Sequence, residues 1–297
     1  MWARHQRKVA PYLFIAPFYI TFLIFLVYPL LWAMYASLTN WTGQAAPDFR
    51  GLRNFEHLVH DHVFWLSVEN TLYLVAGALL ITLPLALLLA LLLDVKWLRG
   101  RGFFRTLFFL PIATVPAVVA VIATGLYDTN HGVINWILVA LGLGKVPWLD
   151  SPDWQKPALL GIIVWRTTGY MMMFLIAGLQ SISEELYDAA AVDGAGPYHR
   201  LRCITLPLLR PMILFAAVLT TINVFQTFDE PFVLNLNSFG APAGPADSGL
   251  TMSFYLYREA FQYGEYGYAS AIGVAILLGL ILLLYVQARA LGLFHED

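Results

Sequence analysis

Long apolar stretches are the feature of this sequence that most limits how the chain can fold. About 20 residues of helix cross the hydrocarbon core of a bilayer, and six stretches reach that length. They lie at residues 9–37, 68–93, 103–127, 157–181, 211–236 and 269–290. The chain is 59% hydrophobic and 12% charged, which leaves little of its 297 residues for a soluble domain. Runs such as 81–93 lack the alternation of barrel strands. We therefore expect an all-α integral membrane protein, with one transmembrane domain of about six helices over residues 1–297.

Several of these stretches contain proline. Pro29, Pro84, Pro111 and Pro116 lie inside predicted spans. A proline removes a backbone hydrogen bond and crowds the preceding turn, so each of these positions predicts a kink.

The distribution of basic residues predicts the orientation of the chain. Lys and Arg gather on the side of the N-terminus, at positions 4, 7, 8, 96, 99, 101, 105, 200, 202, 210 and 289, whereas the other side has only 50, 53, 145, 156 and 258. By the positive-inside rule both termini should be cytoplasmic. The net charge of −2 gives no reason to expect a nucleic-acid partner, and the single Cys203 cannot form an intrachain disulfide.

The segment 181–211 between the fourth and fifth spans is not a generic connector. Its sequence is SISEELYDAAAVDGAGPYHRLRCITLPLLRP. Ser183 can cap a helix whose first turn carries Glu184 and Glu185, where the helix dipole favours acids. That helix should stop near Gly194, and a second short helix from Tyr198 should precede Pro207. The segment is thus expected to form a small two-helix knob at the inner membrane surface.

This knob resembles the EAA loop of binding-protein-dependent ABC importer permeases. The family pattern is E-A-A, three residues, G, nine residues, then I-x-L-P. The matching positions here are Asp188, Ala189, Ala190, Gly194, Ile204, Leu206 and Pro207. Asp188 replaces the family's Glu, which keeps the charge and shortens its reach. The segments GRGFFRTLFFLP, AGLQSI and YREAFQYGEYGYASA are similar to the carbohydrate class, which includes the larger permease subunit of maltose transporters. The likeness extends from Gly100 to Arg289.

The resemblance implies the type I ABC importer permease fold and a set of partners. These are a second homologous permease, two ATPase subunits, an extracytoplasmic solute-binding protein and membrane lipid. ATP and Mg would be bound by the ATPase subunits, because the chain has no Walker A sequence; it should bind no cofactor and should not be an enzyme. The implied location is a bacterial or archaeal cytoplasmic membrane. The coupling surface would comprise Glu184, Glu185, Asp188, Ala189, Ala190, Gly194, Ile204, Leu206 and Pro207.

Polar side chains inside spans are costly and are candidates for the substrate path. The fourth span has Arg166, Thr167 and Tyr170, and the fifth has Thr220, Asn223, Gln226, Thr227, Asp229 and Glu230. Four of the latter, at positions 220, 223, 227 and 230, follow helical spacing on one face. Amide, hydroxyl, guanidinium and aromatic groups suit a polyol. Substrate contacts are therefore expected at Arg166, Thr167, Tyr170, Asn223, Gln226, Thr227 and Asp229. Arg166 could instead pair with Asp229 or Glu230.

Three alternatives remain open on the sequence. Arg166 would also suit the phosphate of a glycerol phosphate or a glycerophosphodiester. An ion-coupled secondary transporter could use intramembrane carboxylates such as Asp229, but it would not need the knob. The group His57, His60, Asp61 and His62 could suggest a metal, yet one short loop beside interfacial aromatic residues favours a solvated segment, so no metal site is expected.

Overall fold

The structure, a computed structural model, describes residues 2–44, 46–95, 98–236 and 243–290, with side chains from residue 12 onward. Within these ranges the chain is mainly helical, and Thr39 and Phe49 form an isolated antiparallel β-bridge. Five helical segments are long and apolar enough to cross a membrane, and a strongly bent pair brings the number to six. The predicted all-α fold with about six spans is confirmed.

The chain divides into two compact units, which are described separately. The first comprises Met1–Asp61 and Leu256–Leu278, and the second comprises His62–Tyr255 and Gly279–Asp297. The helices in chain order are α1 (Trp2–Phe22), η1 (Leu23–Val27), α2 (Tyr28–Ala36), α3 (Arg53–His60), α4 (His62–Asp94), α5 (Arg101–Phe109), η2 (Leu110–Ala113), α6 (Pro116–Leu126), α7 (Val133–Ala140), α8 (Pro152–Gln180), α9 (Glu184–Val192), α10 (Pro197–Arg200), η3 (Leu201–Thr205), α11 (Leu206–Phe225), α12 (Asp229–Leu234), η4 (Pro245–Asp247), α13 (Met252–Tyr257), η5 (Arg258–Gln262) and α14 (Tyr266–Ala290).

The first unit is held together where α2 and α3 meet the start of α14. Asn54 on α3 donates to the backbone oxygens of Ser37 and Thr39, at 2.8 and 2.7 Å. Gly267 packs so closely on Thr39 that an added Cβ would lie 2.3 Å from its carbonyl oxygen. Small residues allow such close approach of backbones in membrane proteins. Close backbone contact therefore contributes to the packing of this unit, together with aromatic contacts such as Trp41 with Tyr266.

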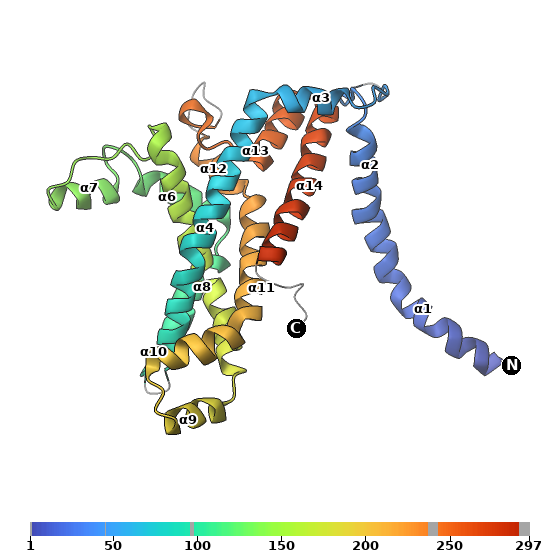
Figure 1. The fold of residues 1–297 in the computed structure, drawn as a ribbon. Helices are drawn as coiled ribbons and strands as arrows, with labels where there is room; N and C mark the ends of the chain where they lie inside the picture. The colour runs from blue at the N-terminus through green and yellow to red at the C-terminus, as the bar shows by residue number, and fades with distance from the viewer. Residues whose placement is uncertain (1, 45, 96–97, 237–242, 291–297) are drawn as a thin grey trace. The chain divides into compact units, whose positions relative to one another are not determined.

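The second unit is built on α4, α8 and α11, which pack against one another along their length (Figure 1). Their shared core combines small and large apolar residues, including Ala86 and Ala90 of α4, Met171 and Leu175 of α8, and Leu209 of α11. Figure 1 shows α9 at one end of this unit and α12 at the other. The two predicted functional regions consequently lie at separate places, one at the end of α8 and one along α8 and α11.

The predicted span 103–127 is not a straight helix. Its two halves, Arg101–Ala113 and Pro116–Leu126, meet at an angle of 97°. Thr114 and Val115 between them are extended, as expected for residues before Pro116. The predicted kink is therefore a sharp break. Pro84, in contrast, lies within the continuous helix α4.

The fifth span begins earlier than predicted. Helical backbone runs from α10 through η3 into α11, because Leu201, Thr205 and Leu206 all have right-handed helical angles. The second short helix expected from Tyr198 is thus the first part of the span. Pro207 lies inside this continuous helical backbone, directly after the π-helical turn η3, and so it does not separate the two.

Candidate functional site

Two polar residues of α8 make different kinds of contact: Thr167 bonds within its own helix, whereas Arg166 reaches another helix. The hydroxyl group of Thr167 donates to the Ile163 carbonyl oxygen at 2.7 Å, one turn earlier, and the residue is buried. Arg166 instead reaches α12, where its Nη2 lies 2.8 Å from Oε1 of Glu230. The Arg166 side chain is 14% exposed and that of Glu230 is 2% exposed. Of the two carboxylates predicted as possible partners of Arg166, Glu230 is therefore the one that pairs with it.

This ion pair depends on charge more than on hydrogen-bond alignment. Despite the short distance, Oε1 of Glu230 receives no aligned hydrogen bond within the described part of the chain, and neither does Nε of Arg166. A buried charge without its counter-charge is strongly unfavourable, so each member of the pair keeps the other tolerable. The pair fixes the start of α12 against α8.

The helical face predicted for the fifth span is interrupted. Helix α11 ends at Phe225 and α12 starts at Asp229, with Phe228 at φ −131° between them. Thr220, Thr227 and Glu230 are buried, whereas Asn223 is exposed, so these four residues do not share a surface. The predicted common face is not observed: Thr220 and Asn223 differ in exposure within α11 itself, and the break after Phe225 separates both from Glu230.

A different set of polar residues is exposed. Asn223, Gln226 and Asp229 are all exposed, while their sequence neighbours Val224, Phe225, Thr227 and Glu230 are buried. We call these three residues the polar stripe. Among the residues that the structure describes, none makes a hydrogen bond or ion pair with a side chain of the stripe. Their polar groups are therefore available to a ligand, whereas the hydroxyl of Thr227 donates to the Asn223 carbonyl oxygen at 3.4 Å.

An aromatic row connects α5, α8 and α11. The ring of Tyr170 lies 6.4 Å from that of Phe109 and 4.9 Å from that of Phe174, and Phe174 lies 5.2 Å from Phe215. The contacts of Phe174 are edge-on, the geometry that aromatic quadrupoles favour. The sequence singled out Tyr170 alone, because the three phenylalanines are unremarkable in spans rich in Phe.

A buried amide cluster, not anticipated from the sequence, fixes the other end of α12. Nε2 of Gln155, at the start of α8, donates to Oδ1 of Asn235 at 2.6 Å, and the hydroxyl of Ser248 donates to Oε1 of Gln155. Nδ2 of Asn235 donates in turn to the Pro231 carbonyl oxygen at 2.6 Å. Gly244 allows the close packing, since a Cβ there would lie 2.1 Å from the Gln155 amide. Helix α12 is therefore joined to α8 at both of its ends.

The predicted coupling segment has the expected capped helix and glycine bend. The hydroxyl oxygen of Ser183 accepts a hydrogen bond from the Glu185 backbone N–H at 3.3 Å, and α9 follows with Glu184 and Glu185 in its first turn. At its end Gly194 has φ +77°, a left-handed conformation that favours glycine. None of the residues of α9 is buried.

Two pockets lie beside α9, and the predicted coupling residues line both. Ala190, Gly194 and Ile204 belong to a pocket of about 480 Å³, together with His199 and Cys203. Glu184 and Asp188 belong to a second pocket of about 370 Å³, whose other polar lining residues are Asp94, Arg101, Gln180 and Tyr187. Ala189, Glu185 and Pro207 are exposed, and Leu206 is half-buried. The hydroxyls of Tyr187 and Thr205 lie 3.0 Å apart and connect α9 to η3.

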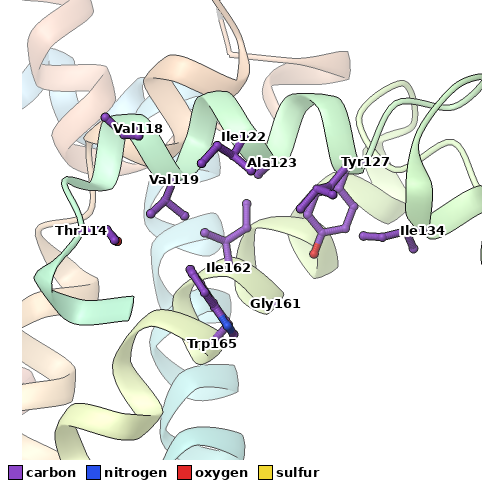
Figure 2. A pocket seen from close by; sticks show the side chains of 11 residues that line it. Thr114, Val118, Val119, Ile122, Ala123, Tyr127, Ile134, Gly161, Ile162 and Trp165 are labelled. Carbon is purple, nitrogen blue, oxygen red and sulfur yellow. The ribbon is translucent and has the colours of Figure 1, made fainter. Parts of the chain in front are cut away.

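A further pocket of about 390 Å³ lies between α6 and α8. Figure 2 shows Val119 and Ile122 of α6 and Ile162 and Trp165 of α8 around it. None of the residues predicted to contact substrate lines this pocket. Its lining is mostly apolar, with Thr114, Tyr127 and Trp165 as the residues that bear hydrogen-bonding groups, so it offers few partners to the many hydroxyl groups of a sugar.

The His-rich segment at residues 57–62 contacts α14 within the first unit through His57 and Asp61. The hydroxyl of Tyr268 donates to Oδ2 of Asp61 at 2.6 Å, and the ring of His57 lies 4.6 Å from the Tyr268 ring. His60 contacts the Glu56 carbonyl oxygen in its own helix at 2.9 Å. These contacts give the segment a role in packing.

The chain is similar to known components of membrane transport systems. The sequence profile described as "Binding-protein-dependent transport system inner membrane component" matches residues 79–292. The chain is 34% identical over 290 residues to the lactose transport system permease protein of Rhizobium radiobacter, covering 97% of this chain and 95% of the relative. It is 34% identical over 296 residues to the trehalose/maltose transport system permease protein of Thermococcus litoralis, covering 99% and 97%.

Two crystal structures share the fold. One is a bacterial ABC transporter involved in the import of the acidic polysaccharide alginate, with a TM-score of 0.84, 26% identity and 99% coverage of both chains. The other is a bacterial alginate ABC transporter in complex with an alginate pentasaccharide-bound periplasmic protein, with a TM-score of 0.82, 26% identity and coverage of 97% and 96%.

Proposed function

Because the chain belongs to the family of binding-protein-dependent transport system inner membrane components, we propose that it is the permease subunit that carries a disaccharide or oligosaccharide into the cytoplasm. The observation that carries the sugar assignment is the polar stripe. It begins at Asn223 on α11, the helix that also contributes Phe215 to the aromatic row. Exposed amide and carboxylate groups can bond to sugar hydroxyls, and Tyr170 can stack on a pyranose ring. The names of the relatives support this assignment, since lactose and trehalose/maltose permeases are 34% identical to the chain.

The energy for transport would come from other chains. We assign ATP and Mg to two ATPase subunits that dock on α9 and the two pockets beside it, and no cofactor to this chain. Small residues such as Ala190 and Gly194 permit close approach of a partner, while Glu184 and Asp188 would orient it. A second permease would complete the path, and an extracytoplasmic solute-binding protein would deliver the sugar, as the complexed structural relative suggests. The chain itself would perform no catalysis.

The proposal is tested on the assembled transporter. The chain, purified with an affinity tag from its native membrane, should bring with it a second permease and two ATP-binding subunits. Reconstituted in proteoliposomes with its binding protein, the complex should take up a neutral sugar such as lactose only with ATP. Isolation of the chain without any ATP-binding subunit, together with uptake driven by an ion gradient, would refute it.

The location of the sugar site has its own test. Asn223→Ala removes one hydrogen-bonding group from the stripe and leaves its sugar partner unsatisfied, at a cost of about 1 to 3 kcal/mol. A loss of binding energy of that size should reduce uptake about five- to a hundred-fold, while the transporter complex still assembles. Asn130→Ala, an exposed asparagine in the turn between α6 and α7, is the matched control and should transport normally.

A further inference from the structure

The polar stripe carries one charge, and that charge is negative. Of its three residues only Asp229 has a carboxylate side chain. Asn223 and Gln226 contribute uncharged amides. The stripe therefore presents a single exposed carboxylate beside two groups that donate and accept hydrogen bonds.

Arg166, the positively charged residue that was predicted to contact substrate, is already paired with a carboxylate. Arg166 was the residue that could have bound an anionic substrate, but its Nη2 lies 2.8 Å from Oε1 of Glu230. Glu230 is almost completely buried, so losing this contact would leave its charge without a partner. Together, the stripe and the Arg166–Glu230 pair have a formal charge of −1.

We propose that Asp229 makes the path selective for charge, admitting neutral saccharides and opposing anionic ones such as uronate oligosaccharides and phosphodiesters. The inference rests on the proposed function and specifies its substrate class. A carboxylate accepts strong hydrogen bonds from sugar hydroxyls, but it repels a second anion in a partly desolvated path. By this reasoning the substrate differs in charge from the acidic polysaccharide of the structural relatives.

A purely structural role for Asp229 is the competing explanation. Asp229 lies in the first turn of α12, where an acid stabilises the helix. Asp153 likewise lies in the first turn of its helix, α8, and is also exposed. Asp153→Asn therefore removes the same charge from the same kind of site outside the stripe, and it serves as the matched control.

The experiment uses charged thiol reagents, because they report local charge without knowledge of the natural substrate. The chain has one cysteine, so Cys203→Ser provides a cysteine-free background in which Gln226→Cys is the only thiol of this chain. The assembled transporter, in open membrane fragments, is treated with a trimethylammonium methanethiosulfonate and with a sulfonate methanethiosulfonate. The ratio of the two labelling rates on this chain is measured with Asp229, Asp229→Asn, Asp229→Glu and Asp153→Asn.

The expected result is a ratio that favours the cation and falls about three- to tenfold in Asp229→Asn. Asp229→Glu and Asp153→Asn should leave the ratio as it was. An unchanged ratio in Asp229→Asn overturns the inference, as does the absence of labelling at position 226 by either reagent. Lactose uptake by the transporter with the unaltered chain is measured in parallel, so a failure of the proposed function is recognised separately from a failure of charge selection.

Discussion

At the scale of single residues, the sequence identified Arg166 as important but did not decide its partner. Asp229 and Glu230 are adjacent, and on one continuous helix either could have faced α8. The break after Phe225 turns Glu230 inward and leaves Asp229 exposed. No glycine or proline lies in the break itself, so neither of the usual local signals was present at residues 226–228.

The Arg166–Glu230 pair leads to the first prediction. Arg166→Gln and Glu230→Gln should each destabilise the folded chain by about 3 kcal/mol, because each leaves a buried charge without its partner. The double variant should recover most of that loss, since both charges are then absent. Thermal unfolding in detergent measures all three. Losses that simply add in the double variant would show that the two residues are not coupled.

At the scale of helices, the sequence predicted the existence of the spans better than their shape. Apolar length alone indicated α4 and α8, and Ser183 with Gly194 indicated the limits of α9. Pro111 and Pro116 predicted a kink in the third span but not its angle of 97°. The joined ends of α12 could not be predicted, because they depend on contacts between residues distant in sequence, such as Gln155 with Asn235. The polar stripe was missed as a surface for the same reason.

The close approach of α5 to α8 leads to the second prediction. A Cβ added at Gly169 would lie 1.7 Å from the Phe108 carbonyl oxygen, which is backbone and cannot move aside cheaply. Gly169→Ala should therefore lower stability by about 1 to 3 kcal/mol. Gly125→Ala, in α6 with open space around it, should not. Equal melting temperatures for the two variants would contradict the packing described.

The bend after α9 leads to the third prediction. Gly194 has φ +77° and open space around it, so a side chain there is strained without a clash in the isolated chain. Gly194→Val should leave the permease folded but abolish sugar-stimulated ATP hydrolysis, because the bend and the pocket beside it are altered. Gly196→Ala also has open space but no left-handed φ, and it should remain coupled. Normal coupling in Gly194→Val would remove the knob from the coupling surface.

At the scale of the whole molecule, composition predicted a membrane protein and the EAA pattern predicted its family. The match over residues 79–292 supports the same family and leaves the ion-coupled alternative without a basis. A fold has no inherent direction across a bilayer, however, so the orientation depends on the distribution of Lys and Arg. That distribution places Arg53 outside and Arg101 inside, and both side chains are exposed.

The last prediction tests this orientation. Arg53→Cys and Arg101→Cys, each in the Cys203→Ser background, are treated in intact spheroplasts with a maleimide that cannot cross membranes. Arg53→Cys should be labelled directly, and Arg101→Cys only after the membrane is opened, because basic residues near spans are retained on the cytoplasmic side. The parent chain provides the control, since exposed Cys203 lies in the predicted cytoplasmic segment and should behave like Arg101→Cys. Labelling of Arg101→Cys in sealed spheroplasts would reverse the orientation, and α9 would then face away from any cytoplasmic ATPase.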